Sequence, residues 1–196
     1  GGIHDQIGGG FHRFAADAAW RVPSFEKLLV TNAELLTAYA DAHRLTQHPR
    51  YKEIAEGIVT WVMREMRDPA GWFLPYQAAE ARLGDDGDYY TWTIEEAKAA
   101  LTEETATWIL PGFDIGEWGE MTTSAPRRNV LHLSEGPLLL SARLGEDEAK
   151  IATGFEAGRR QLLEARGKRP MPPAGKILVT DANAAMAVAL IRAGDG

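Results

Sequence analysis

The sequence predicts a mainly α-helical fold, in which helical hairpins form part of an (α/α) toroid with short β-hairpin insertions. Apolar residues recur at three- and four-residue steps in two neighbouring segments, which is the period of an amphipathic helix. Further along, aromatic pairs flank a turn-rich stretch, a pattern typical of a β-hairpin. The length of 196 residues suits one domain with a sizeable core, so we expect a single domain over residues 1–196.

The first predicted element is a helical hairpin. A proline and a serine precede an apolar stripe from Phe25 to Tyr39, which predicts a helix that ends near His43. After a polar break, the same period over residues 51–66 predicts a second helix. Because the connection is short, the two helices should pack antiparallel.

The pattern then changes to a predicted β insertion. The pair Trp72 and Phe73 and the aromatic residues within 89–92 flank the sequence LGDDGD at residues 83–88. Glycine and aspartate clusters of this kind favour turns, so we expect a β-hairpin or two paired extended segments.

A capping box opens the next predicted helix. Thr93 at the N-cap and Glu96 three residues later can each bond the backbone of the other, so a helix should follow to about Leu101. The remaining predicted elements are loops over residues 111–134 with a short extended stretch at 129–133, and helices over residues 146–166 and 181–192.

Composition excludes several classes of function. The net charge is −7 and the basic residues are scattered, which argues against a nucleic-acid partner. No apolar run approaches the roughly 20 residues of a membrane span, and the first residues lack the features of a signal peptide, so we expect a cytoplasmic chain with no membrane partner. Without cysteine, disulfides, thiolate metal sites and a cysteine nucleophile are excluded.

The opening residues concentrate the groups that can carry chemistry. The triplet Gly8 to Gly10 allows backbone conformations closed to other residues. Around it stand side chains that hydrogen-bond, titrate or carry charge: Asp5, Gln6, His12, Arg13 and Glu26. Such a cluster before an amphipathic helix is typical of the loop rim of a pocket. The alternative is a tight turn whose polar side chains cap backbone groups.

Five stretches resemble, in order, the helical region of the YyaL/spermatogenesis-associated protein 20 family. They are GGIHDQIGGGFHRF at residues 1–14, PSFEKLLVTNAELLTAY at 23–39, YYTWT at 89–93, RRNVLHL at 127–133 and KILVTDANAAMAVALIRAG at 176–194. The resemblance implies an (α/α) barrel similar to six-hairpin glycosidases and N-acylglucosamine 2-epimerases, of which this chain would be the first part. In that family a thioredoxin-like domain precedes the barrel, so such a domain is an expected partner and the chain an expected fragment.

Barrels of this kind suggest acid/base chemistry on a carbohydrate. Glycoside hydrolysis needs two carboxylates about 5 to 10 Å apart, and epimerisation needs a base beside the sugar carbon. Asp5 and Glu26 are the best candidate pair, and His12 is the best general base because an unperturbed imidazole titrates near neutrality. Glu26 has an alternative role, since an acidic residue in the first turn of a helix is stabilised by exposed N–H groups.

Further residues are candidates for substrate contact. Gln6 and Arg13 could bind hydroxyls, and the rings of Trp20 and Trp92 could stack on a pyranose. Asn32, on the apolar stripe, is a candidate as well, although it could instead bond buried backbone. For the tryptophans, ordinary core packing is the alternative.

No cofactor is expected from the sequence, and no metal site. The histidines that could ligate an ion show no ligand-like spacing with Asp or Glu: His4, His43, His48 and His132.

Three departures from the family pattern leave two functions open. Ser24 stands where the family has a histidine, YQAAEAR at residues 76–82 replaces an acidic run and leaves Glu80, and only Asn183 remains of a Trp-Asn-Gly motif. One function is an enzyme domain that hydrolyses or epimerises a sugar. The other is a non-catalytic binding or scaffold module that accompanies a thioredoxin-like domain. An open partial toroid would expose apolar helix faces, so we also expect self-association.

Overall fold

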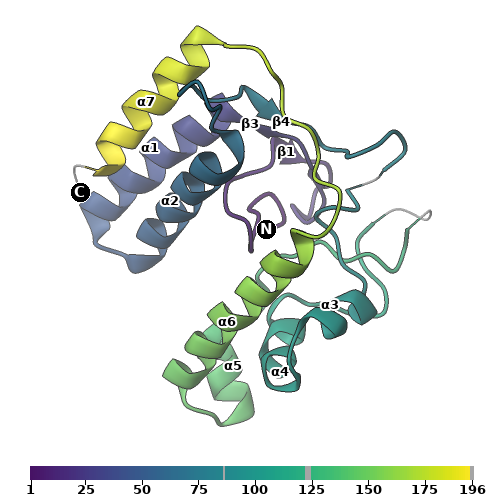
Figure 1. Cartoon of the computed structure of the whole chain (residues 1–196). Helices are drawn as coiled ribbons and strands as arrows, with labels where there is room; N and C mark the ends of the chain where they lie inside the picture. The colour runs from purple at the N-terminus through teal and green to yellow at the C-terminus, as the bar shows by residue number, and fades with distance from the viewer. Residues whose placement is uncertain (86, 122–124, 195–196) are drawn as a thin grey trace.

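The computed structural model describes residues 1–85, 87–121 and 125–194, and this part of the chain is mainly helical (Figure 1). It contains seven α-helices, one π-helical turn and two small two-stranded antiparallel sheets. In chain order the elements are β1 (Phe14–Ala15), β2 (Pro23–Ser24), β3 (Lys27–Leu28), α1 (Leu29–Thr46), α2 (Pro49–Trp61), η1 (Val62–Met66), β4 (Tyr76–Gln77), α3 (Ile94–Ala100), α4 (Glu103–Gly112), α5 (Pro137–Leu144), α6 (Glu148–Arg166) and α7 (Thr180–Gly194).

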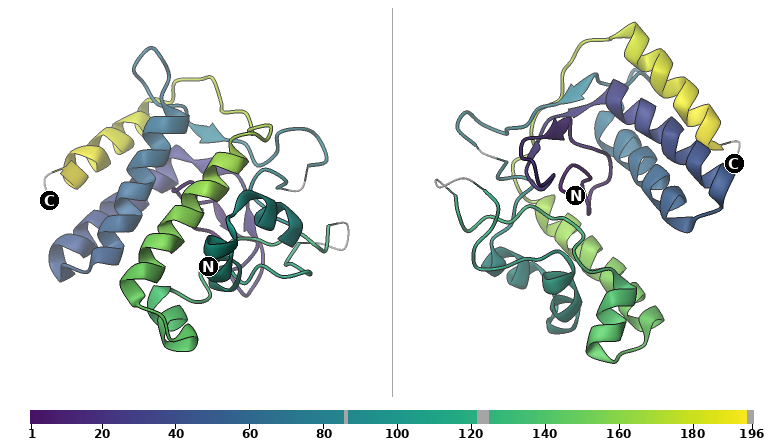
Figure 2. Two further views of the ribbon diagram at one scale, coloured as in Figure 1. Left: turned by 60° about the horizontal axis from the view of Figure 1, so that its bottom comes forward. Right: turned by 180° about the vertical axis from the view of Figure 1, so that it is seen from behind.

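The helices form two groups with separate hydrophobic cores (Figure 1, Figure 2). Helix α1 packs against α2 and α7, around the fully buried side chains of Leu36, Trp61 and Met186. Helices α3, α4 and α5 pack against α6, around Ile109 and Leu162, and we call these four helices the α3–α6 group. A third, smaller cluster lies among the loops and includes Phe25 and Tyr90.

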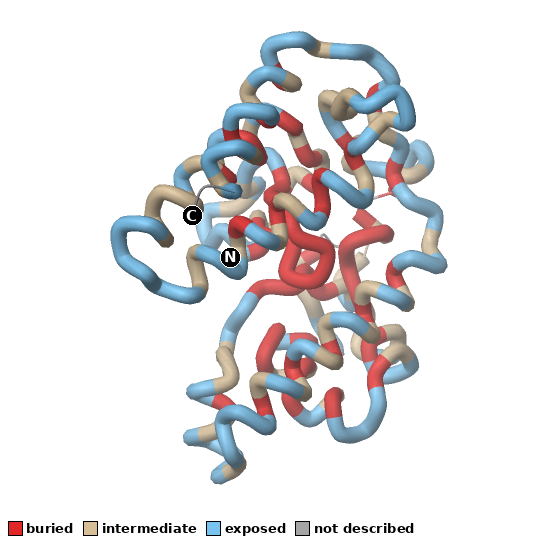
Figure 3. The backbone as a smooth tube through the Cα atoms, turned by 60° about the vertical axis from the view of Figure 1, so that its left-hand side comes forward, coloured by how far each residue is buried: buried red, intermediate tan, exposed pale blue. Residues whose placement is uncertain are grey.

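The N-terminal loop, residues 1–12, lies between the two helical groups and is largely buried (Figure 3). Ile7 belongs to the core of the α3–α6 group, whereas Phe11 belongs to the core of the α1, α2 and α7 group. The loop therefore contributes apolar side chains to both cores.

The predicted helical hairpin is confirmed. Helix α1 ends at Thr46, its C-cap residue Gln47 has the left-handed conformation, and α2 begins with Pro49 in its first turn. The side chain of His48 caps α2 by accepting a hydrogen bond from the backbone N–H of Arg50. The second helical pattern continues to Met66 as predicted, but its last turn is the π-helical η1.

The prediction that the first helix includes Phe25 and Glu26 is wrong. Helix α1 starts at Leu29, because Lys27 and Leu28 are extended and pair with Gln77 and Tyr76 of β4. Glu26 therefore lies before the helix and does not stabilise its first turn. The apolar stripe begins at Phe25 because the extended segment also buries this side chain, four residues before the buried Leu29 of the helix.

The predicted β-hairpin between residues 72 and 92 does not form among the described residues. Phe73 bridges to Arg67, and Trp92 bridges to Asn129, so each aromatic segment pairs with a different part of the chain. Residue 86, within the predicted turn, lies outside the described residues.

The later helices are only partly as predicted. The capping box of Thr93 and Glu96 is present at α3, and the predicted helices at residues 146–166 and 181–192 correspond to α6 and α7. Helices α4 and α5 were not predicted. In the part of the chain that the structure describes, no helix is long and apolar enough to cross a membrane.

Candidate functional site

The N-terminal loop closes on itself through backbone hydrogen bonds. Asp5 N–H donates to Gly10 O at 3.0 Å, and His12 N–H donates to Ile3 O at 2.8 Å. Gly9 has a φ of 77°, and a Cβ there would lie 2.2 Å from the carbonyl oxygen of Gly57 in α2. Glycine is required at this position because the backbone is left-handed and touches the helix directly.

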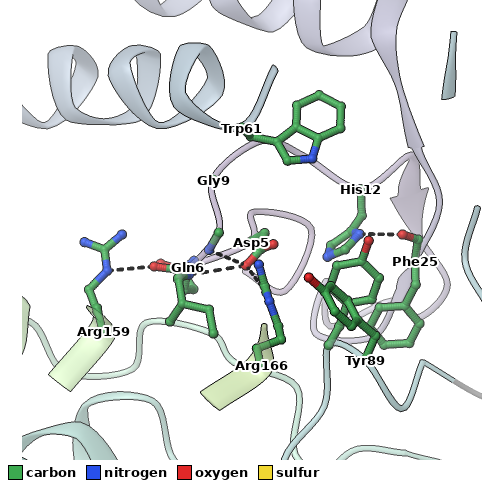
Figure 4. A network of polar contacts seen from close by, with 12 residues as sticks. Asp5, Gln6, Gly9, His12, Phe25, Trp61, Tyr89, Arg159 and Arg166 are labelled. Atoms are coloured by element: carbon green, nitrogen blue, oxygen red, sulfur yellow. Dashed lines mark hydrogen bonds and ion pairs between the residues drawn. The ribbon is translucent and has the colours of Figure 1, made fainter. Parts of the chain in front are cut away.

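Asp5 is the centre of the polar contacts in this loop (Figure 4). Its Oδ1 accepts hydrogen bonds from Gly8 N–H and from Arg166 Nη1, each at 2.9 Å, and its Oδ2 accepts one from Lys27 Nζ at 2.7 Å. The carboxylate therefore connects the loop to β3 and to the C-terminal end of α6. All three charged side chains are almost completely buried.

Aromatic rings surround the two buried cations. Lys27 Nζ lies 5.1 Å from the Trp61 ring centroid and also donates to Gly9 O at 2.8 Å. The guanidinium of Arg166 lies 5.1 Å from the Tyr89 ring centroid. Cation–π attraction of this kind is strongest where water is excluded, so it offsets part of the desolvation of both cations.

Asp5 remains ionised in this environment. Burial disfavours the charged carboxylate, but Arg166 and Lys27 outweigh that effect and hold the pKa of Asp5 well below its usual range. A general acid must carry a proton at the working pH. The ion pairs therefore remove the property that acid catalysis by Asp5 would need.

His12 is buried beside Asp5 and is neutral near pH 7. Burial, with a further contribution from the charge of Lys27, lowers the pKa of His12 from 6.5 to about 3. Its Nδ1 lies 2.8 Å from Phe25 O, and its ring packs edge-on against Phe25 and Tyr90. An imidazole with so low a pKa is a weak base at neutral pH.

The structure brings three of the predicted site residues to one small cavity. Asp5, Gln6 and His12 line a space of about 10 Å³, together with Phe25 and Tyr90. This volume is about that of one water-sized probe. A sugar ring does not fit in this cavity as it stands.

Arg13 and Glu26 lie apart from this cavity and bind one another. Their side chains form an ion pair of 2.7 Å near the surface, where Arg13 is half exposed. Glu26 thus does not form a close carboxylate pair with the buried Asp5.

The remaining candidates for substrate contact, Trp20, Trp92 and Asn32, lie outside this cavity. Trp20 is exposed, whereas Trp92 is buried in the core of the α3–α6 group. Asn32 clamps the end of the loop, since its side chain accepts from Phe11 N–H at 2.7 Å and donates to Phe11 O at 3.0 Å. The alternative that Asn32 bonds buried backbone is therefore confirmed.

The sequence analysis did not identify Arg166 as a site residue, although the pattern of buried residues in α6 indicates it. It continues the apolar stripe of α6 at three- and four-residue steps: Ile151, Phe155, Gly158, Leu162 and Arg166 are all buried. A charged residue in register with a buried stripe indicates an internal ion pair.

A charged cleft opens between α2 and α6, and we call it the interhelical cleft. One part, of about 240 Å³, has the loop residues His4 and Gly8 among its lining. Arg50, Glu53 and Arg159 also line the adjoining part, of about 900 Å³.

Arg159 organises the charges of this cleft. Its Nη1 donates to Glu53 at 3.0 Å and to Glu156 at 2.7 Å. Its Nε donates to Gln6 O at 2.7 Å, as Figure 4 shows. Partial burial opposes ionisation of Glu53, but Arg50 and Arg159 prevail and lower its pKa. The cleft therefore presents fixed charges of both signs.

A separate cluster in the loops between α4 and α5 contains possible metal ligands. The ligand atoms of Asp114, Glu120 and His132 all lie within 4.8 Å of one another. Histidine spacing along the sequence gave no indication of this cluster, because the two carboxylates come from a different loop segment.

Comparison with known proteins shows homology to one region of longer proteins. The chain is 31% identical to human spermatogenesis-associated protein 20 over 192 residues, which cover 88% of this chain and 24% of that protein. It is 28% identical to the mouse protein of the same name, over 87% of this chain and 24% of the relative. An uncharacterised protein of Caenorhabditis elegans is 26% identical, over 98% of this chain and 29% of the relative. No family model matches.

The chain thus spans about a quarter of the length of the curated relatives that it matches.

Proposed function

We propose that the chain is one region of a longer protein of the spermatogenesis-associated protein 20 family, and that it is a ligand-binding scaffold rather than an acid/base catalyst. Homology over most of its length supports the family assignment. Within the longer protein, its helices would form part of an (α/α) toroid, and a thioredoxin-like domain would be its partner.

One observation carries the choice of scaffold over catalyst. The oxygens of Asp5 are occupied by Lys27, Arg166 and the N–H of Gly8, and the carboxylate is buried among them. A buried carboxylate held by two cations stabilises the arrangement of the chain. The cavity that Asp5 lines has a volume of about 10 Å³, which is too small to hold a sugar ring beside the carboxylate.

The interhelical cleft is the proposed binding site, and a carbohydrate is the proposed ligand class. Carboxylates and guanidinium groups hydrogen-bond sugar hydroxyls, and Glu53, Glu156, Arg50 and Arg159 place both kinds along the cleft. Leu138, which is exposed, and Leu133 add an apolar wall. Polar groups that fix orientation beside apolar surface are typical of small-molecule sites.

The catalytic alternative is favoured by one specific observation. Asp5, Gln6 and His12 do meet at a single cavity, as a catalytic loop would require. In this alternative the loop opens to admit a sugar, and His12 and Asp5 act with Glu26 in acid/base roles.

Calorimetric titration with mono- and disaccharides, sugar phosphates and small peptides tests the proposal. We expect saturable binding of a sugar that Arg159→Gln weakens at least about tenfold, since it removes a charged hydrogen-bond donor from the cleft. Arg160→Gln is the matched control, because Arg160 is the next residue of α6 and is exposed outside the cleft. Equal loss in both variants, or no sugar binding at all, would contradict the proposal.

Activity assays distinguish the catalytic alternative. Under the proposal, the chain neither hydrolyses glycosides nor epimerises sugars. Turnover that is lost in His12→Gln, with helical content and melting cooperativity preserved, would establish the catalytic alternative instead.

A further inference from the structure

Three potential metal ligands converge on one point of the surface between α4 and α5. His132 Nε2 lies 3.9 Å from Asp114 Oδ2, and His132 Nδ1 lies 3.7 Å from Glu120 Oε1. Because one ligand atom from each of the three residues lies within 4.8 Å of the others, all three can face a single ion. These residues do not line the interhelical cleft.

His132 is held as a metal-ligating histidine usually is. Its side chain is about nine-tenths buried, and Nδ1 lies 3.1 Å from Val130 O. Donation from Nδ1 to this carbonyl leaves the lone pair on Nε2, which lies 3.9 Å from Asp114 Oδ2. Metal-ligating histidines commonly donate their other ring N–H to a carbonyl in this way, which fixes the tautomer.

The two carboxylates are also positioned by the backbone. Glu120 Oε2 accepts a hydrogen bond from Val130 N–H at 3.0 Å, which holds the carboxylate beside the ring with Oε1 3.7 Å from Nδ1. Asp114 has a φ of 53°, a left-handed conformation in the turn that follows α4. Asn129 joins the two segments, since its side chain bonds both Gly116 N–H and Gly116 O at 3.0 Å.

The charge balance of the cluster favours a cation. Two carboxylates face one imidazole, and one basic group lies near them: Arg21, whose Nη1 is 3.9 Å from Glu120 Oε1 and whose side chain is half exposed. A divalent ion bound between the two carboxylates would neutralise both, whereas this half-exposed guanidinium contacts Glu120 alone.

We propose that Asp114, Glu120 and His132 bind one first-row divalent cation, and that Zn²⁺ is preferred. Imidazole favours Zn²⁺ and its neighbours over Mg²⁺ and Ca²⁺, which prefer oxygen ligands. Three protein ligands leave the fourth tetrahedral position to water. Ligand atoms around tetrahedral Zn²⁺ are roughly 3.4 Å apart, so the ligands need to move inward by about half an ångström or more.

Bound metal would fasten the loop after α4 to the segment that carries His132. The site is independent of the proposed function, because it shares no residue with the interhelical cleft. Its direct effect is on the stability of the chain, since an ion that binds only the folded state raises the melting temperature by mass action.

Titration of the untagged, chelator-treated chain with ZnCl₂ tests this inference. We expect one Zn²⁺ per chain, a higher melting temperature, and visible d–d absorption on loading with Co²⁺. MgCl₂ and CaCl₂ should produce no comparable binding. Asp114→Asn should weaken Zn²⁺ binding at least about tenfold, because it replaces a charged ligand by a neutral amide. The side chain of Asp114 is exposed, so this substitution should leave the packing of the chain intact.

Two further variants complete the test. His132→Gln should also reduce Zn²⁺ affinity and remove the Co²⁺ absorption band. Glu117→Gln is the matched control, because Glu117 is an exposed acidic residue of the same loop outside the cluster. This variant should bind Zn²⁺ with the affinity of the unaltered chain. Absence of saturable Zn²⁺ binding, or binding that Asp114→Asn and Glu117→Gln affect equally, would overturn the inference.

Discussion

At the scale of single residues, Asp5 is unusual because one buried carboxylate faces two buried cations. Lys27 and Arg166 both bind it directly, and Glu65 supplies a second negative charge nearby. Glu65 is held in turn by Gln77, whose Nε2 donates to it at 3.1 Å. Buried charges tolerate the loss of a partner poorly, since the remaining charge is left without compensation.

Replacing Asp5 should therefore destabilise the chain far more than replacing a surface partner. Asp5→Asn leaves Lys27 and Arg166 without their carboxylate, and we expect a loss of about 3–5 kcal/mol in the free energy of unfolding. Glu26→Gln breaks the surface ion pair with Arg13 and should cost less than about 1 kcal/mol. Urea denaturation of both variants measures the difference, and similar values for the two would refute the assigned role of Asp5.

Buried histidines predict a loss of stability in acid. Burial lowers the pKa of His4 to about 4 and that of His12 to about 3, from 6.5 in each case. Between pH 6.5 and these values the unfolded chain binds more protons than the folded chain, so stability falls as the pH falls. The slope of the unfolding free energy against pH should approach the value for two protons, roughly 2–3 kcal/mol per pH unit. Below pH 4, Asp5 adds a further loss because its folded pKa is depressed.

Urea denaturation at several pH values between 7 and 4.5 measures this slope. In His12→Gln the slope should decrease by the equivalent of about one proton, because the variant lacks one of the two buried imidazoles. A free energy of unfolding that does not change over this pH range would show that the two histidines are accessible to protons in the folded chain.

The sequence located the polar loop but did not give the roles of its residues. Asp5, Gln6 and His12 do meet, as the density of polar groups around the glycine triplet suggested. Their burial depends on partners far along the chain, above all Arg166, which is 161 residues from Asp5. Local spacing carries no information about such a contact.

At the scale of elements, the start of α3 was predictable from its side-chain cap, whereas the start of α4, which Thr102 also caps, was not predicted. The Thr93 and Glu96 capping box is formed by residues three apart, so it is readable from the sequence. The start of α1 has no side-chain cap and is set by the pairing of β3 with β4, almost 50 residues away. Helix α5 is short, with eight residues, and its run of leucines has too few turns to show a helical period.

The contact between the N-terminal loop and α2 predicts opposite effects at two glycines. Gly9→Ala should destabilise the chain by several kcal/mol, because its Cβ would lie 2.2 Å from Gly57 O in a left-handed backbone. Gly57→Ala should stabilise it by about 0.5–1 kcal/mol, because a Cβ there meets Gly9 Cα at an ordinary 3.8 Å and alanine favours the helix. Thermal melts of both variants check the signs. Destabilisation by Gly57→Ala comparable to that by Gly9→Ala would contradict this contact.

At the scale of the whole molecule, the N-terminal loop connects two helical groups that otherwise have separate cores. Ile7 enters one core and Phe11 the other, while Asp5 joins β3 to α6. The mainly helical character was predictable from periodicity, but the joining of the groups was not, because it depends on contacts between the two ends of the chain. Self-association stays a prediction, for which α7 offers the exposed side chains of Val188 and Ile191.

Hydrogen exchange of the loop amides tests most directly whether the N-terminal loop is a buried structural element. Gly8 N–H and Phe11 N–H donate to the side chains of Asp5 and Asn32, and His12 N–H donates to Ile3 O. We expect these three amides to exchange with free energies close to those of the most protected amides of α1 and α6. Exchange as fast as in the exposed segment 18–21 would contradict the account and indicate a loop that opens readily to a substrate.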